Sequence, residues 1–266
     1  MQRDQFITKP NSAFQQLEAL KLSRTKRSKT GQVFVEGVIP VNLLLESGTE
    51  VTGVYTNADV SLSDWAQDVS ERASGSQRFH VSSELMSQLS DRDSPSELIL
   101  TATRPTWVSN ALEVDRLLIM DRPTSPGNLG TVIRTCDAFG IDAIFLFGRA
   151  ADPFDPKCIA ASRGTVFSQK TSVLESKHAL EALIDRCRSR DRFTLYGSSS
   201  KEGKSLSAIS ATDRFGLIVG NETKGMSSYL AALVDQMVTI PMRGNATSLN
   251  LAAATSVLLY GLSGTL

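Results

Sequence analysis

The chain has 266 residues, of which 41% are hydrophobic and 21% charged, and its 28 basic residues balance 28 acidic ones. This composition is typical of a globular protein with one large domain or two smaller ones, and it argues against a polycation. No apolar run approaches the roughly 18 residues of a bilayer-spanning helix, so we expect no membrane association. Cys136, Cys158 and Cys187 lie far apart, which argues against disulfides and zinc and favours a reducing cytoplasm.

Short helices and strands alternate over the first hundred residues, which predicts a small α/β lobe covering residues 1–106. Asn11 can cap a first helix that carries Phe14, Leu17 and Leu20 on one side. Further helices are expected over residues 41–45, 62–73 and 83–89, and strands over residues 33–35, 51–55, 79–81 and 98–101.

The beginning of this lobe is basic. Residues 1–30 hold seven Lys or Arg side chains against two acidic ones, and four of the seven are Arg24, Lys26, Arg27 and Lys29. A local basic patch of this kind can contact phosphate even when the whole chain is neutral.

A linker is predicted at residues 107–113, shortly after Pro105, and a second domain at residues 114–266. The strands expected there are near-continuous apolar runs, which are typical of a parallel sheet buried on both faces. They cover residues 117–120, 143–147, 193–196, 215–219 and 237–240, and the clearest helices cover residues 129–139, 179–188 and 249–262. The residue pattern by itself therefore predicts an unknotted, Rossmann-like α/β sheet.

Three polar, glycine-containing loops follow strands of this second domain, at residues 126–130, 220–225 and 241–250. Open α/β sheets bind ligands at the carboxyl ends of their strands, so we expect one composite site. Asn128 lies where a helix begins, a place at which free backbone N–H groups can bind a ligand. Arg134 lies opposite the apolar stripe of the same helix and points either to solvent or into a cleft.

The other two loops admit both a functional and an ordinary interpretation. Gly220 lets the chain turn or approach a ligand closely, and Glu222 could hold a cation or fix an arginine, although a plain polar turn has the same composition. The helix after residues 241–250 is apolar almost all round, so we expect it and its start to be buried. Ser248 could be its N-cap, with Asn250 facing a neighbouring element.

A stretch at residues 197–205 is similar to a phosphate-binding P-loop, but five residues separate its glycines where the motif requires four. Nucleoside triphosphate binding is therefore not favoured. His80 and His178 are isolated in the sequence, which argues against a Ser-His-Asp or Cys-His hydrolase.

Taken together, the three loops resemble the three motifs of the SpoU/TrmH family of S-adenosylmethionine-dependent RNA ribose 2′-O-methyltransferases, within the SPOUT class. The matching stretches are residues 128–134, 219–227 and 240–250, in the family's order. Residues 24–37 are similar to the basic segment of the ribosomal-protein-like domain that many members carry. Thr223 and Lys224 depart from the family, which often has a small residue or Gly at these positions, and Lys224 adds a positive charge near the site.

The resemblance implies a deep trefoil knot in the second domain, a homodimer packed through it, and S-adenosylmethionine as cofactor without a metal. The cofactor-binding residues that it implies are Gly220, Asn221, Ile240, Met242, Ser248 and Leu249. The catalytic residues that it implies are Arg134, Asn128, Glu222, Ser248 and Asn250. It further implies that the side chains of Arg24, Lys26, Arg27 and Lys29 contact RNA phosphates.

In the family's reaction Arg134 either draws off the proton of the 2′-hydroxyl or orients the attacking oxygen, and the pKa of a free arginine, above about 12, makes it a very poor base. Ribosomal RNA is the favoured substrate, with large-subunit 23S-type RNA foremost, in a housekeeping or an antibiotic self-resistance role. A tRNA 2′-O-methyltransferase and a non-catalytic RNA-binding protein are the alternatives.

Overall fold

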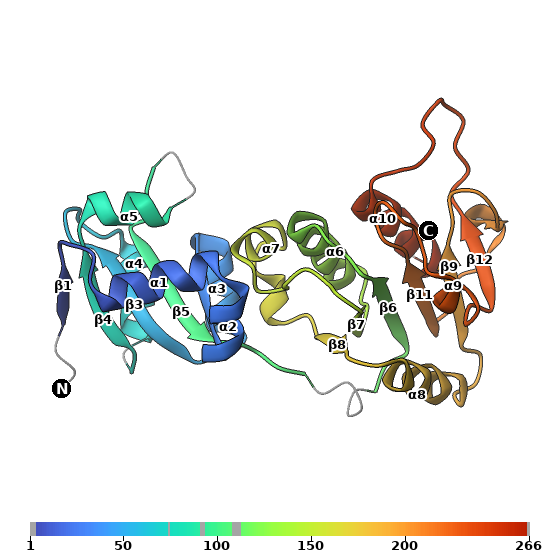
Figure 1. Ribbon diagram of the computed structural model, residues 1–266, viewed down its shortest axis with the longest axis horizontal. Coiled ribbons are helices and arrows are strands. Elements are labelled where there is room, and N and C mark those ends of the chain that lie inside the picture. The colour runs from blue at the N-terminus through green and yellow to red at the C-terminus, as the bar shows by residue number, and fades with distance from the viewer. Residues whose placement is uncertain (1–3, 74, 91–93, 108–112, 265–266) are drawn as a thin grey trace. The chain divides into compact units, whose positions relative to one another are not determined.

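The computed structural model describes residues 4–73, 75–90, 94–107 and 113–264, and the chain divides into two units (Figure 1). Unit 1 comprises Met1–Pro105 with Phe154–Ser168, and unit 2 comprises Thr106–Pro153 with Gln169–Leu266. Most of the predicted linker, residues 108–112, lies outside the described residues. Residues 154–168, which we expected in the second domain, pack in unit 1.

Unit 1 is the small α/β lobe that the sequence predicts. Its mixed sheet has the strand order β1-β4-β3-β5-β2, in which β3 pairs parallel with β4 and antiparallel with β5. The strands are β1 (Gln5–Ile7), β2 (Gln32–Glu36), β3 (Val51–Asn57), β4 (Gln77–Val81) and β5 (Leu98–Thr103). The helices are α1 (Ser12–Leu22), α2 (Arg24–Thr30), α3 (Val38–Glu46), α4 (Asp64–Arg72), α5 (Ser83–Leu89) and α7 (Pro156–Ala161).

A buried arginine holds α7 in unit 1. Arg27, on α2, is 1% exposed, and its guanidinium donates to the backbone oxygens of Leu20 and Lys21 and to Asp155 Oδ2, 3.1 Å away. Asp155 is also the N-cap of α7. A buried cation must be paired and hydrogen-bonded, which explains why Arg27 binds several acceptors at once. The prediction that Arg27 contacts RNA is therefore wrong, because its charge faces inward.

Unit 2 is a parallel α/β sheet with the strand order β10-β12-β9-β11-β6-β7-β8 over the described residues. Its strands are β6 (Arg116–Asp121), β7 (Ala143–Phe147), β8 (Thr171–Leu174), β9 (Thr194–Ser198), β10 (Lys204–Ser205), β11 (Phe215–Val219) and β12 (Gln236–Thr239). Its α-helices are α6 (Pro126–Ala138), α8 (Lys177–Arg188), α9 (Ser228–Ala231) and α10 (Leu251–Leu262). The predicted α/β class and parallel sheet are confirmed, while the trefoil knot stays a prediction.

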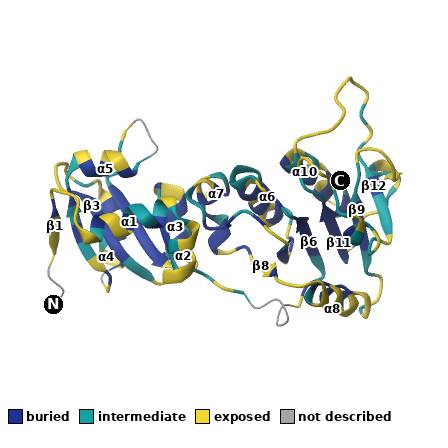
Figure 2. Ribbon diagram, viewed as in Figure 1, coloured by how far each residue is buried: buried dark blue, intermediate teal, exposed yellow. Residues whose placement is uncertain are grey.

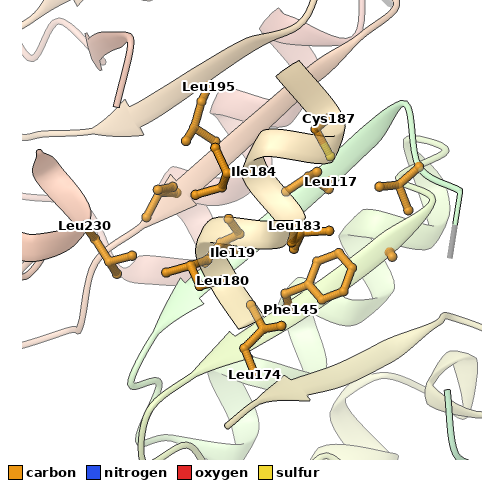
Figure 3. Packing of buried hydrophobic residues seen from close by; sticks show 13 residues of the cluster. Leu117, Ile119, Phe145, Leu174, Leu180, Leu183, Ile184, Cys187, Leu195 and Leu230 are labelled. Carbon is orange, nitrogen blue, oxygen red and sulfur yellow. The ribbon is translucent and has the colours of Figure 1, made fainter. Parts of the chain in front are cut away.

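Helix α8 covers one face of this sheet (Figure 3). Its buried side chains follow the i, i+3, i+4, i+7 spacing of an amphipathic helix, and they are Leu180, Leu183, Ile184 and Cys187. They pack against Leu117, Ile119 and Phe145 of the central strands. The strands are thus buried between helices, as their continuous apolar runs predict.

Because β12, β9, β11 and β6 are parallel neighbours, their carboxyl ends meet at one edge of the sheet. The three polar loops follow β6, β11 and β12 and so emerge at this edge. Within the described residues, every helix is too short or too polar to cross a bilayer.

Candidate active site

Helix α6 carries Arg134 on its exposed side. Leu129, Val132, Ile133 and Cys136 are buried on the opposite side, as their spacing predicts. Arg134 makes no hydrogen bond or ion pair with any residue that the structure describes. Its guanidinium is therefore available to an external ligand.

The start of α6 differs in detail from the prediction. Ser125 is the N-cap, and its hydroxyl accepts from the backbone N–H of Asn128 at 3.3 Å. That N–H is consequently not free for a ligand. The side-chain amide of Asn128 makes the contacts instead: its Nδ2 donates to Glu222 at 3.4 Å, and its Oδ1 accepts from Asn250 Nδ2 at 3.2 Å.

Glu222 joins the loop after β11 to the loop after β6. Its carboxylate accepts from the N–H and hydroxyl of Thr124, the N–H of Ser125, and the amides of Asn128 and Asn221, at 3.1–3.4 Å. Burial by itself would raise the pKa of this carboxyl, but the backbone and Asn128 hydrogen bonds together lower it. Glu222 therefore binds the start of α6, and it contacts no arginine among the described residues.

The third loop joins the network through Asn250. Its Oδ1 accepts from the N–H groups of Ala252 and Ala253, which makes Asn250, and not Ser248, the N-cap of α10. The predicted burial of this helix start is wrong: residues 243–250 are exposed and project from the sheet (Figure 2). The cap itself satisfies the first N–H groups, so burial against a neighbour is not needed.

Gly220 is required where the loop after β11 folds back on itself. Asn221 and Gly225 exchange two backbone hydrogen bonds of 3.0 Å, and the Asn221 side chain accepts from the N–H groups of Thr223 and Lys224. A Cβ on Gly220 would lie 2.3 Å from the backbone nitrogen of Met226. A larger residue at position 220 would therefore push the turn apart.

A cavity of about 360 Å³ is lined by the loops after β11 and β12 and by the start of α10. All six residues that the resemblance assigns to the cofactor line it, namely Gly220, Asn221, Ile240, Met242, Ser248 and Leu249. Glu222 lines it as well. Met226, Val238, Leu251, Ala254 and Leu258 add an apolar wall. Among the described residues, His, Cys, Asp and Glu form no group of three that could hold a metal ion.

The loop after β9 also lines the cavity, although the sequence suggested only an imperfect P-loop there. Ser198, Ser199, Ser200 and Lys201, from the P-loop-like stretch, line it. That stretch continues into β10 and a 3-10 turn rather than a helix, which agrees with its rejection as a P-loop. Its position after β9, the neighbour of β11, is the signal that could have placed it at the site.

A second cavity, of about 690 Å³, lies at the opposite, amino ends of β9 and β11. It is lined by Asp191, Arg192, Asp213 and Arg214, among others. Several of these charges are engaged in ion pairs, such as Arg214 with Asp115 at 3.1 Å. None of the three motif loops reaches it, so we assign the site to the smaller cavity.

A parallel α/β sheet with a cavity at its carboxyl edge, lined by the loops after β9, β11 and β12, defines a ligand-binding α/β protein of the doubly wound type. The model of the SpoU rRNA Methylase family matches residues 115–260, and that of the SpoU L30e-like domain matches residues 11–123. The chain belongs to the SpoU rRNA methylase family.

Two relatives and one solved structure are similar over nearly the whole chain. The 23S rRNA (uridine(2479)-2′-O)-methyltransferase of Streptomyces viridochromogenes is 32% identical, over 96% of this chain and 90% of its own. The 23S rRNA (guanosine(2553)-2′-O)-methyltransferase RlmP of Bacillus subtilis is 28% identical, over 91% and 92%. The crystal structure of the SpoU methyltransferase AviRb from S. viridochromogenes with AdoMet superposes with a TM-score of 0.88 at 31% identity, over 96% and 98%.

We predict that Gly220→Ala weakens S-adenosylmethionine binding by about tenfold or more, because overpacking of about 1–3 kcal/mol displaces the loop that lines the cavity. Isothermal titration calorimetry measures this dissociation constant. Gly244→Ala is the matched control: position 244 lies in the third loop, where a Cβ meets no atom within 4 Å. Equal affinities for wild type and Gly220→Ala would contradict the assignment of the cavity.

Proposed function

We propose that the protein transfers the methyl group of S-adenosylmethionine to a ribose 2′-hydroxyl of ribosomal RNA, with 23S-type RNA as the substrate. The observation that carries this proposal is the hydrogen-bonded chain Glu222–Asn128–Asn250, which joins all three family motifs beside one cavity. The two 23S-modifying relatives support the RNA class. They act on a uridine and a guanosine, so the target base is left to experiment.

The cavity suits S-adenosylmethionine because it pairs an apolar wall with polar loop backbone. Leu249, Leu251 and Leu258 can pack against the adenine, and the loop around Gly220 offers polar groups near the same space. When bound, this cofactor supplies a methyl group that its positive sulfur already activates. The new O–C bond forms as the S–C bond breaks, so S-adenosylhomocysteine leaves and the hydroxyl proton passes to solvent. The protein's task is to hold the 2′-oxygen in line with the methyl group and to let that proton depart.

Arg134 orients the attacking 2′-oxygen and binds an adjacent phosphate in this proposal. It is exposed and free of partners among the described residues, and it lies on the same helix as Asn128. An arginine keeps its charge at neutral pH, so it serves better as a fixed donor than as a base. Asn128, Glu222, Ser248 and Asn250 position the ribose, the cofactor and the helix that carries Arg134.

Unit 1 supplies the phosphate contacts of the proposal. Arg24, Lys26 and Lys29 remain as its RNA-contacting residues, all on α2, and Arg27 is withdrawn because it is buried. Such contacts position an RNA without reading its sequence. The three cysteines are buried and form no disulfide among the described residues. We place the protein and its RNA together in the cytoplasm.

Replacing Arg134 tests the function most simply. We expect Arg134→Ala to lower kcat about a hundredfold or more, and Arg134→Lys to recover little, because a lysine lacks the planar pair of donors. The assay follows radiolabel from S-adenosylmethionine into unmodified total ribosomal RNA and, separately, into unmodified total tRNA. Arg149→Ala, which removes another exposed arginine of unit 2, is the control.

Label in ribosomal RNA that disappears with Arg134→Ala supports the proposal, and mapping then gives the nucleotide. Label in tRNA alone would overturn the substrate and keep the chemistry. A protein that binds the cofactor and labels neither RNA, nor an assembled ribosomal subunit, would be a non-catalytic RNA binder.

The protein also acts as a homodimer in this proposal, packed through unit 2. Leu249, Val257 and Tyr260 leave an apolar face exposed at and along α10, each about 40% accessible. Tyr260 also contacts Phe139 at the end of α6, with ring centroids 5.8 Å apart. Exposed apolar residues that follow one helix face are typical of a protein interface.

We predict a dimer mass by light scattering for the wild type and a monomer for Val257→Asp, because an aspartate at the centre of an apolar interface is desolvated without a partner. Val60→Asp is the matched control, since Val60 is a similarly exposed valine in unit 1. A monomeric wild type at micromolar concentration would contradict the dimer.

A further inference from the structure

An ion pair between a buried aspartate and a half-buried arginine lies beside the candidate site. Asp121, the last residue of β6, is 1% exposed, and its two carboxylate oxygens accept from Nε and Nη2 of Arg122 at 2.7 and 2.9 Å. Neither residue belongs to the three motif stretches, and neither lines the cavity. Burying a carboxylate costs free energy unless the group is paired and hydrogen-bonded, so the charge of Asp121 depends on the donors around it.

The pair holds both ends of the loop after β11. At the first end, the side-chain amide of Asn221 donates to the backbone oxygen of Arg122 at 2.8 Å. At the second end, the backbone N–H of Ser227 donates to Asp121 Oδ2, also at 2.8 Å. Residues 221–227 are thus held at the carboxyl end of β6 by two contacts, one at each end of the segment.

The backbone of Arg122 adopts a conformation that its own side chain does not favour. Its φ of 50° lies in the left-handed region, which is uncommon for residues other than glycine. Its N–H donates to the backbone oxygen of Phe147. Its side chain packs closely over Gly148, since a Cβ added at position 148 would lie only 2.9 Å from Arg122 Cγ. The two hydrogen bonds to Asp121 compensate for this conformation and fix the direction of the Arg122 backbone oxygen.

The geometry points to Asp121 as a positioning residue for methyl transfer, an inference that rests on the proposed function. Through Arg122 and Ser227, Asp121 fixes the loop that presents Gly220 and Asn221 to the cavity. The same loop carries Glu222, which holds Asn128 on α6. Asp121 touches neither cofactor nor RNA itself. Its effect therefore reaches both the cofactor pocket and the helix that bears Arg134.

Asp121→Asn is the informative substitution. Asparagine has nearly the same shape, but it lacks the charge and presents an N–H donor to one of the three donors that now surround the carboxylate. Asp142→Ala is the matched control, because Asp142 Oδ2 accepts from the N–H groups of Asp115 and Arg116 at the amino end of β6. Both carboxylates bind backbone around the same strand, and Asp121 alone lies at the site.

We expect Asp121→Asn to weaken S-adenosylmethionine binding and to lower kcat at saturating cofactor, each by about tenfold or more, the scale of one lost hydrogen bond to a charged group. RNA affinity stays within about twofold, because unit 1 supplies the phosphate contacts. Asp142→Ala lowers Tm and leaves the cofactor affinity and kcat of the folded protein unchanged. Calorimetry gives the cofactor affinity, steady-state kinetics gives kcat, and thermal unfolding gives Tm. Affinity and kcat are measured at a temperature well below the Tm of the wild type and of both variants.

Cofactor affinity and kcat within twofold of wild type for Asp121→Asn, whatever its Tm, would overturn the inference. An equal kinetic effect of Asp142→Ala would overturn it as well, because any loss of stability would then suffice. The cofactor titration needs no RNA. A wild type that binds S-adenosylmethionine and methylates no RNA would defeat the proposed function, while the role of Asp121 in shaping the loop would still be measured.

Discussion

Glu222, in the loop after β11, accepts hydrogen bonds from residues 124–128, which lie nearly one hundred positions earlier in the sequence. These hydrogen bonds hold the site together. Its carboxylate binds the Thr124–Ser125 turn and Asn128, and Asn128 in turn binds Asn250. The hydrogen bonds favour the charged form and lower the pKa of Glu222. Because the folded pKa lies below the unfolded value of about 4.3, the stabilisation is fully present above that value and is lost as the pH falls through the folded pKa.

Much of this arrangement could be predicted from the sequence. Continuous apolar runs located β6, β7, β9, β11 and β12 to within a few residues, because a buried parallel strand has few alternatives. The loops after β6, β11 and β12 were expected at one site, since the carboxyl ends of parallel strands share an edge. Periodicity alone placed Arg134 on the outer side of its helix, where the structure has it. The hydrogen bonds between Glu222, Asn128 and Asn250 needed the structure, because sequence spacing carries no side-chain direction.

Other features follow from contacts that the sequence does not display. Arg27 lies in a basic stretch that is typical of an exposed surface. Its burial depends on an ion pair with Asp155, 128 residues away in the sequence. The apolar sequence of α10 predicted a fully buried helix, but Val257 and Tyr260 are exposed, on a face that a second copy of the chain would cover in our proposal. The loop after β9 was identified only as a failed P-loop, because its role depends on strand order: β9 lies between β11 and β12. Asp121 lies just past the strand predicted over residues 117–120, and the sequence does not display its contacts with Arg122 and Ser227.

The central claim is that Glu222 and Asn250 act together through Asn128, and a double-mutant cycle tests it most directly. Glu222→Gln removes the charge at one end, and Asn250→Ser keeps a cap for α10 while its short side chain no longer reaches Asn128. The methyl-transfer kcat is measured for wild type, both single variants and the double variant. The account predicts that the double variant loses less than the sum of the single losses, with a coupling energy of about 1 kcal/mol or more. Losses that add to within about 0.5 kcal/mol would show that the two loops act independently and would contradict it.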